Sequence, residues 1–158
     1  VESAAQMHEQ CMLIFPETDG AVMCAAVADF TPESYSENNL KRGNDEITIH
    51  LKPTNDIAGD LGQIKSSKQI LVGFALETND ELINAYSKLK RKNLNFIILN
   101  SMQDAGAGFG VDTNKITIID KNNNQAFFEL KSKAEVAVDI VDRIVAEMEK
   151  KEVRIKKE

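Results

Sequence analysis

The sequence has no tryptophan, and its 158 residues include only two cysteines and two histidines. Cys11 and Cys24 form no CxxC motif, and His8 and His50 stand in no pattern with carboxylates or cysteines. These residues therefore indicate neither a metal site nor a catalytic triad. We predict that both cysteines are buried free thiols rather than a disulfide, and we assign no role to the histidines.

Long apolar segments and an excess of positive charge are also lacking. No apolar run approaches the roughly 20 residues that a bilayer span needs, and no charged leader with an apolar core precedes the first elements. The formal net charge is -6 at pH 7. A nucleic-acid partner is not expected, because binding to a phosphate backbone requires clustered cations. We therefore predict a cytoplasmic protein with no nucleic-acid or membrane partner.

The length and the 42% hydrophobic content suffice for one well-buried domain. We expect a single domain over residues 1–158. Strand and helix patterns alternate, which predicts the α/β class: three layers, a mostly parallel Rossmann-like sheet and a C-terminal antiparallel hairpin. Because such a domain rarely opens on a helix, we expect the chain to be the later part of a longer domain.

The elements follow from periodicity and from turn formers. Thr54 or Asn55 is the expected cap of the second helix, and the polar segment 31–45 is expected to be a loop, with an active-site flap as one interpretation. Helices are expected over 2–15, from 54 or 55 to 62, 78–92 and 132–149, and strands over 20–26, 46–51, 70–76, 96–99, 115–120 and 126–130.

The segment 70–92 organises the chain. Its apolar run without polar alternation predicts a central parallel strand that is buried on both faces, and Thr78 with Glu81 forms a capping-box pattern. Acidic residues at this helix start would repel a phosphate. Lys88 and Lys92, four residues apart on one helical face, are the better candidates for phosphate contact, and the alternative is that they only solvate the helix and complement its dipole.

Two further patterns suggest ligand contacts. Asp29 follows the strand over 20–26, and ligands of open α/β sheets bind beyond the carboxyl ends of strands; an ordinary loop aspartate is the alternative. The Lys41–Arg42 pair of the polar loop could contact a phosphate, or it could only keep that loop soluble. Gly106 and Gly108 do not form a dinucleotide fingerprint with Gly110, because the spacing is wrong and a strand follows instead of a helix.

Five linked motifs occur in order over nearly the whole chain. They are MCAAVADF (23–30), LKPTNDIA (51–58), VGFALET (72–78), KLKRKN (88–93) and GFGVDTN (108–114). Together these motifs resemble bacterial phosphopantothenoylcysteine synthetase, the ligase of coenzyme A synthesis.

The resemblance implies a two-step reaction. CTP with Mg²⁺ activates the carboxylate of 4′-phosphopantothenate as an acyl-cytidylate with release of pyrophosphate, and the amine of cysteine then displaces CMP. It also implies a homodimer and, in many bacteria, fusion to a decarboxylase that holds FMN. No metal-holding residue is assigned. The nucleotide contacts that the resemblance implies are Met23, Cys24, Ala25, Asp29, Asn55, Asp56, Ile57, Ala58, Phe74, Lys88 and Lys92.

The sequence departs from the family pattern at three places. Asn39 stands where the family has a lysine that serves the activated intermediate, so Lys41 is the candidate substitute. Asn55 stands where proline is usual. The family's N-terminal glycine-rich segment is absent from the sequence, and we expect that residues 1–158 alone lack a complete active site. A nucleotide-binding module without catalysis is the alternative function, and an α/β oxidoreductase is a third that the glycine context disfavours.

Overall fold

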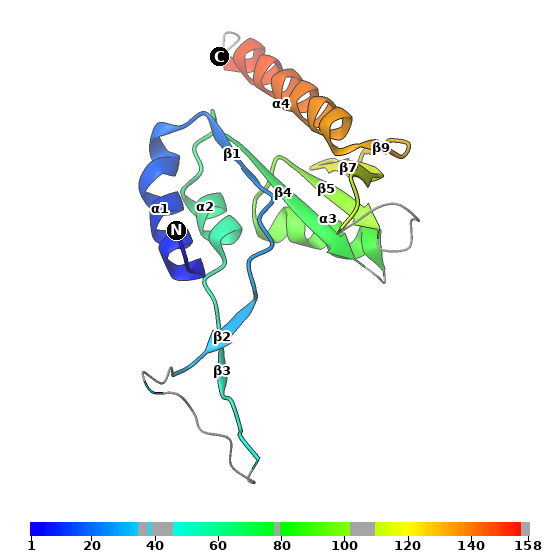
Figure 1. Cartoon of the computed structure of the whole chain (residues 1–158). Helices are drawn as coiled ribbons and strands as arrows, with labels where there is room; N and C mark the ends of the chain where they lie inside the picture. The colour runs from blue at the N-terminus through cyan, green and yellow to red at the C-terminus, as the bar shows by residue number, and fades with distance from the viewer. Residues whose placement is uncertain (35–37, 39–45, 78–79, 102–109, 156–158) are drawn as a thin grey trace.

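The computed structural model of the chain describes residues 1–34, 38, 46–77, 80–101 and 110–155. Helices are interspersed among its strands (Figure 1). The elements are α1 (Ala4–Ile14), the 3-10 helix η1 (Phe15–Glu17), β1 (Gly20–Met23), β2 (Phe30–Pro32), β3 (Leu51–Pro53), α2 (Ile57–Ile64), β4 (Ile70–Glu77), α3 (Glu81–Arg91), β5 (Phe96–Ser101), β6 (Thr113–Asn114), β7 (Ile116–Asp120), β8 (Gln125–Phe127), β9 (Lys131–Ser132) and α4 (Lys133–Ile155).

The main sheet has the strand order β1-β4-β5-β7-β8. β4 lies parallel to both β1 and β5, with Val22 opposite Val72 and Val72 opposite Phe96. β7 and β8 extend the sheet as an antiparallel hairpin. This confirms the predicted α/β class, including the parallel centre and the C-terminal hairpin.

Helices cover both faces of the sheet, which gives three layers (Figure 1). On β4, Leu71 and Ala75 belong to the buried cluster that also contains side chains of α2 and α3, with α1 packed against it. Ile70 and Val72 belong to the cluster formed with α4. Since successive side chains of a strand point to opposite faces, the unbroken apolar run of β4 supplies both cores.

β1 differs from the expected buried strand. It ends at Met23 and pairs only with β4 among the described strands, and Val22 is 42% exposed. The position at the sheet edge leaves one side of the strand without a neighbouring backbone. The prediction that both cysteines are buried is wrong. Cys24, just after β1, is exposed, and Cys11 on α1 is only half-buried, although both are free thiols.

The strand expected over 46–51 is also wrong. Regular pairing begins only at Leu51, and β3 pairs antiparallel with β2, which the sequence analysis had missed. The two strands form an arm that extends away from the sheet (Figure 1). Ile47 and Ile49 are 65% and 67% exposed. The alternating pattern therefore does not face the domain's own core.

Two helix starts differ from the sequence prediction. α2 is capped by Asp56, whose Oδ1 accepts the Gly59 N–H at 3.0 Å, and not by Thr54 or Asn55. α3 begins at Glu81, and its preceding residue Asp80 has φ 47° and makes no side-chain cap. Thr78 lies outside the described residues.

α4 is longer than predicted. It continues to Ile155, and near its end the Lys151 Nζ donates to the Gln69 carbonyl at 2.7 Å. This tertiary contact holds the turns of the helix beyond residue 149 against the start of β4. Val141 and Val145 of this helix are 54% and 47% exposed, so its apolar side chains are not all buried against the sheet.

Candidate functional site

A cavity of about 870 Å³ lies at the carboxyl ends of β1 and β4. We call it the strand-end pocket. Its walls come from the loop after β1, the turn between β3 and α2, and the last turns of α3. Ligands of parallel α/β sheets bind at this edge. The predicted contacts that line it are Met23, Ala25, Asp29, Asn55, Asp56, Ile57, Ala58, Phe74, Lys88 and Lys92.

Cys24 is the one predicted nucleotide contact that does not line this pocket. It lines a neighbouring cavity of about 470 Å³, which also borders Met23, Ala25 and Phe74 but extends toward α4. The structure therefore places the backbone of residues 23–25 between two cavities. The nucleotide contact of Cys24 stays a prediction.

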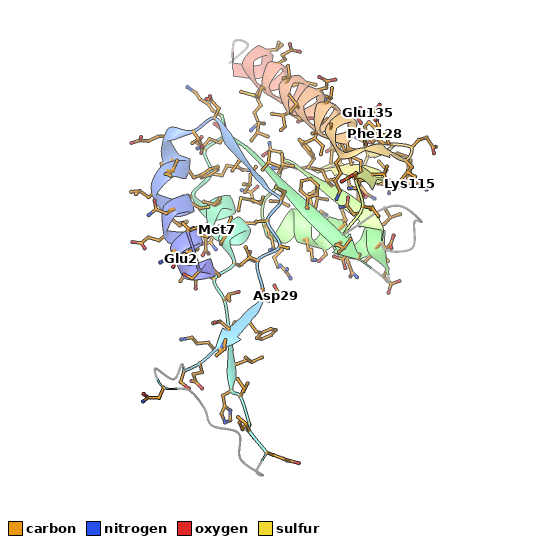
Figure 2. The ribbon with its side chains drawn as sticks, viewed as in Figure 1. Glu2, Met7, Asp29, Lys115, Phe128 and Glu135 are labelled. Carbon is orange, nitrogen blue, oxygen red and sulfur yellow. The ribbon has the colours of Figure 1, made fainter. Side chains whose placement is uncertain are left out.

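Two hydrogen bonds fix the turn before α2 against the loop after β1. The Thr54 hydroxyl donates to the Ala28 carbonyl at 2.6 Å, and the Thr54 N–H donates to the Asp29 carbonyl at 2.9 Å. Asp29 lies where the arm joins the body of the domain (Figure 2). These bonds hold Asp29 and Asn55 on one wall of the pocket, although the two residues are far apart in the sequence.

Asp56 connects this wall to α3. Its Oδ1 lies 2.8 Å from the Lys92 Nζ and also caps α2. Partial burial opposes ionisation of the carboxyl, but the hydrogen bonds from Lys92 and Gly59 and the charges of Lys92 and Arg91 outweigh it and lower the pKa of Asp56. The positive end of the α2 dipole at Ile57 and Ala58 therefore already has an ionised carboxylate beside it.

Lys88 also has a carboxylate partner. Its Nζ lies 2.6 Å from the Glu77 Oε1 at the end of β4. Lys88 and Lys92 thus form part of the pocket wall, and each is fixed there by an ion pair with a carboxylate. A polyanionic ligand would add its charges beside these pairs or displace the carboxylates from them.

The sequence analysis missed Arg91, which lines the same pocket. Arg91 follows Lys88 by three residues, so helical spacing alone brings the two onto neighbouring positions of one face. The i,i+3 relation was the signal that could have found it. Together with Lys92, this residue makes the α3 wall strongly basic.

The sequence analysis also gave no role to His8, which contacts the turn at the pocket. Its Nε2 lies 2.7 Å from the Asp60 Oδ2, and its Nδ1 lies 3.2 Å from the Asn55 Nδ2. Since the Asn55 amide donates, Nδ1 accepts, and the proton of the neutral ring lies on Nε2 and is donated to Asp60. No sequence signal linked α1 to α2, because 47 residues separate His8 from Asn55.

The predicted catalytic positions Asn39 and Lys41 lie outside the described residues, as do Gly106 and Gly108. In the described part of the chain, no group of three or more His, Cys, Asp and Glu side chains is placed to hold a metal ion. None of the described helices combines the length and the apolar character that crossing a membrane would require.

Comparison with known proteins identifies the domain. Residues 1–148 match the family model described as the DNA/pantothenate metabolism flavoprotein C-terminal domain. The chain belongs to this family. A crystal structure of the C-terminal domain of the coenzyme A biosynthesis bifunctional protein CoaBC shares 35% identity with it at a TM-score of 0.75, covering 95% of this chain and 67% of that one.

Two curated relatives of this DNA/pantothenate metabolism flavoprotein domain have different names. A protein named cysteine/cysteine sulfinic acid decarboxylase, from an unknown prokaryotic organism, is 59% identical over 145 residues, which are 92% of this chain and 40% of that protein. The CoaBC protein of Bacillus subtilis strain 168 is 41% identical over 146 residues, or 92% of this chain and 36% of that protein. The chain thus spans well under half of either relative.

Proposed function

We propose that the domain is the ligase part of a coenzyme A biosynthesis enzyme, which joins 4′-phosphopantothenate to cysteine through an acyl-cytidylate made from CTP. The observation that carries the proposal is the strand-end pocket. It gathers nearly all the residues that the motif resemblance assigned to the nucleotide, from β1, the α2 turn, β4 and α3. Membership of the family and the similarity to CoaBC support the same assignment.

The proposed first step needs the triphosphate charge to be offset. A carboxylate oxygen of 4′-phosphopantothenate attacks the α-phosphorus of CTP, and the bond to the β-phosphate oxygen breaks, so that pyrophosphate leaves. Lys88, Arg91 and Lys92 supply cations on one wall of the pocket for the phosphates. Phe74, a half-buried residue of β4 that lines the pocket, offers a ring against the base or ribose.

Mg²⁺ fits this arrangement as a companion of the nucleotide. It commonly binds through one or two carboxylates and the substrate phosphates and keeps several waters, and Asp29 and Asp56 are the carboxylates that line the pocket. The ion would offset phosphate charge there. Asp56 is engaged by Lys92, so Asp29 is the better candidate to approach the metal-bound nucleotide.

In the proposed second step, the amine of cysteine attacks the acyl carbon, the bond to the CMP oxygen breaks, and the amine loses a proton. The resemblance assigns the stabilising charge at this stage to the position of Asn39. A neutral amide cannot supply it, so we propose Lys41 as the substitute. In an active protein, Asn39→Lys should then speed conversion of the acyl-cytidylate, and an unchanged rate of both half-reactions would show that the alignment at this position is wrong.

The proposal is tested by calorimetry with CTP, ATP and GTP and by an assay for CMP. Two samples are compared: residues 1–158, and the same domain with whatever residues its gene encodes before Val1. We expect CTP binding by both and CMP release that depends on cysteine only in a sample with the family's glycine-rich segment. Pyrophosphate release at a normal family rate by residues 1–158 alone would overturn the expectation of an incomplete site. CTP binding without CMP in every sample would favour a non-catalytic module.

A second candidate rests on the relative at 59% identity, which is named a cysteine/cysteine sulfinic acid decarboxylase. In this case the domain would accompany a decarboxylase part that holds FMN, and its own pocket would bind a ligand without ligation. Release of CO₂ from cysteine or cysteine sulfinic acid by the full-length protein, with no CMP from CTP, would select this function. CMP formation that needs 4′-phosphopantothenate would select the ligase.

We also propose that the domain forms a homodimer through its arm. The β2–β3 arm exposes four large apolar side chains along its length, and no described residue of the same chain covers them. They are Phe30 (58% exposed), Ile47 (65%), Ile49 (67%) and Leu51 (57%). A second copy of the chain, with the same apolar arm, would remove this surface from water.

A further inference from the structure

A second cavity, of about 740 Å³, lies at the other end of the sheet from the strand-end pocket. It is bordered by the segment between α2 and β4, the start of β5, the turn after β7 and the last turns of α4. We call it the lysine cleft, because Lys65, Lys121, Lys150 and Lys151 line it. Its volume falls in the range of about 300–1,000 Å³ that is usual for small-molecule sites.

The two cavities have no lining residue in common. They approach each other at the turn between α3 and β5, where Lys92 and Leu94 line the strand-end pocket and Asn93 and Asn95 line the lysine cleft. On its far side the cleft reaches the residue before β4, because Lys151 donates to the carbonyl of Gln69. A ligand in the lysine cleft would therefore contact a different set of residues from a nucleotide in the strand-end pocket.

Three of the lysines are held by neutral oxygens. Lys65 Nζ donates to the Asn93 carbonyl and, at 2.9 Å, to the Asn95 Oδ1. Lys121 Nζ donates to the Asn93 Oδ1 at 3.2 Å, and Lys151 donates to the backbone of Gln69. Among the ion pairs seen in the described part of the chain, none involves Lys65, Lys121 or Lys151. Carbonyl and amide oxygens accept hydrogen bonds from these three ammonium groups, and no described carboxylate forms an ion pair with them.

The carboxylates on the wall are engaged elsewhere. Asp120 accepts from the N–H groups of Asn122 and Asn124, each at 2.9 Å, and lies 3.4 Å from Arg143. Glu147 lies 2.9 Å from Arg143 and 3.3 Å from Lys150. These two anions therefore share their charge with Arg143 and Lys150, and positive charge remains in excess on the side of Lys65, Lys121 and Lys151.

The lysines of the cleft lie close enough to lower one another's pKa values. Burial, followed by the charges of Lys121 and Lys151, lowers the pKa of Lys65 to about 7. Burial and the charge of Lys121 also lower the pKa of Lys151, against a smaller favourable effect of Glu147. Ammonium groups that depress one another's protonation gain stability when an anion comes between them.

We propose that the lysine cleft binds the phosphate group of a small molecule, at a site distinct from the strand-end pocket. Lys65, Lys121 and Lys151 supply the charges for a dianion. Ser66 and Asn122 line the same cavity and offer neutral donors. The cavity is larger than one phosphate requires, so the class is a phosphorylated organic molecule or pyrophosphate. The inference rests on the cleft alone and is independent of the ligase proposal.

The test uses the whole domain and three probes: inorganic phosphate, pyrophosphate and glycerol 3-phosphate. Binding is followed by calorimetry and by NMR of the lysine side-chain methylene groups next to Nζ. We expect saturable binding of at least one probe, with shifts at Lys65, Lys121 and Lys151. Tighter binding of the ester or of pyrophosphate than of inorganic phosphate would assign the ligand to the larger class, and the reverse would make free phosphate the ligand.

Matched variants separate the cleft from the other cavity. Lys121→Gln with Lys151→Gln should weaken binding at least tenfold, whereas Lys68→Gln, an exposed lysine outside the cleft, should change it less than twofold. Lys88→Gln, on the wall of the strand-end pocket and paired with Glu77 at the end of β4, should leave the cleft signals unchanged. Should the double variant not fold, Lys121→Gln alone should still weaken binding severalfold, because it removes one of the cations. The fold should tolerate this change, since the ammonium of Lys121 donates to the Asn93 Oδ1 in an exposed contact of 3.2 Å. Non-saturable binding, shifts confined to Lys88 and Lys92, or an unchanged affinity in the folded double variant would overturn the proposal.

Protonation gives an independent readout. The groups that face Lys65 are Lys121, Lys150, Lys151, Asp120 and Glu147, with Arg143 behind the two carboxylates. In the protein without ligand, the pKa of Lys65 is about 7, and a bound dianion raises it. Binding near pH 8 should therefore take up protons. The affinity for the dianion should fall as pH rises above 7, because Lys65 loses its charge. An affinity that does not change from about pH 6 to pH 9, apart from ionisation of the phosphate itself, would contradict the role of Lys65.

Discussion

Lys92 and Asp56 meet at 2.8 Å across the strand-end pocket, through the carboxylate oxygen that also caps α2. One atom thus joins the end of α3 to the start of α2. The contact positions the basic wall of the pocket and at the same time stabilises a helix terminus. Changes at either residue should therefore affect both ligand binding and stability, and the two effects can be separated by the choice of variant.

Replacement of Lys88 or Lys92 by glutamine should weaken binding of CTP more than binding of CMP, because a triphosphate presents more charge to the α3 wall. A charge-assisted hydrogen bond is worth about 1.5–3 kcal/mol, so we expect roughly a 10- to 100-fold loss for CTP. Calorimetry with both nucleotides checks this. Lys90→Gln is the matched control, since Lys90 lies over the Tyr86 ring outside the pocket. Equal losses for CTP and CMP would count against a phosphate role.

Asp56→Ala should destabilise the domain at pH 7 by about 1 kcal/mol, the usual value for a lost N-cap. The folded-state pKa of Asp56 is lowered from 3.8, so its ionised form contributes stability above pH 3.8 that is lost as pH falls through the folded pKa. The difference between wild type and variant should thus shrink as pH falls below 3.8. Urea unfolding at pH 7 and at a series of pH values below 3.8 measures it. A difference that grows on acidification would show that the sign is wrong.

Gly62→Ala should perturb the site through the backbone. A Cβ at this buried position would lie 2.0 Å from the Lys92 carbonyl oxygen and 2.9 Å from its carbon, so α2 must move away from the end of α3. We expect a loss of about 2 kcal/mol or more in unfolding free energy and weaker CTP binding, because the Lys92–Asp56 contact spans the same two helices. Gln63→Ala, on the exposed side of α2, is the control and should be nearly neutral. Wild-type stability of Gly62→Ala would exclude this close approach.

The sequence predicted the parts of the site that depend on local pattern. The apolar run of β4 and the hairpin of β7 and β8 could be predicted because period and turn residues specify them, and linked motifs indicated most of the pocket lining. The edge position of β1 and the course of the arm could not be predicted, because both depend on which strands pair in the folded chain. The Asp56 cap was missed because Asn55 is as good an N-cap residue as Asp56 and Thr54 is only somewhat weaker. In the structure, hydrogen bonds to Ala28 and His8 engage Thr54 and Asn55 instead.

The arm gives a prediction about assembly. Ile49→Lys places a charge among the exposed apolar residues of the arm, and if two copies meet there, the dimer should dissociate at concentrations where the wild type stays paired. Light scattering on size-exclusion fractions measures the mass. Leu13→Lys is the control, because Leu13 is 69% exposed on α1, away from the arm. A wild-type chain that is monomeric at high concentration would refute the dimer, and an unchanged dimer in Ile49→Lys would remove the arm from its interface.

The bond between His8 and Asn55 predicts that a residue of α1, which does not line the strand-end pocket, influences binding there. His8→Phe keeps a ring but cannot accept from Asn55 or donate to Asp60, so the Asn55 amide loses its fixed orientation. We expect CTP affinity to fall severalfold, since Asn55 lies on the wall of the pocket. The decisive measurement is a double-mutant cycle with Asn55→Ala. Because the two residues act through one hydrogen bond, their losses in affinity should be clearly less than additive.

His50→Phe, on the exposed segment before β3, is the control and should bind CTP as the wild type does. Fully additive losses would mean that His8 acts on the α1–α2 packing alone and does not position Asn55.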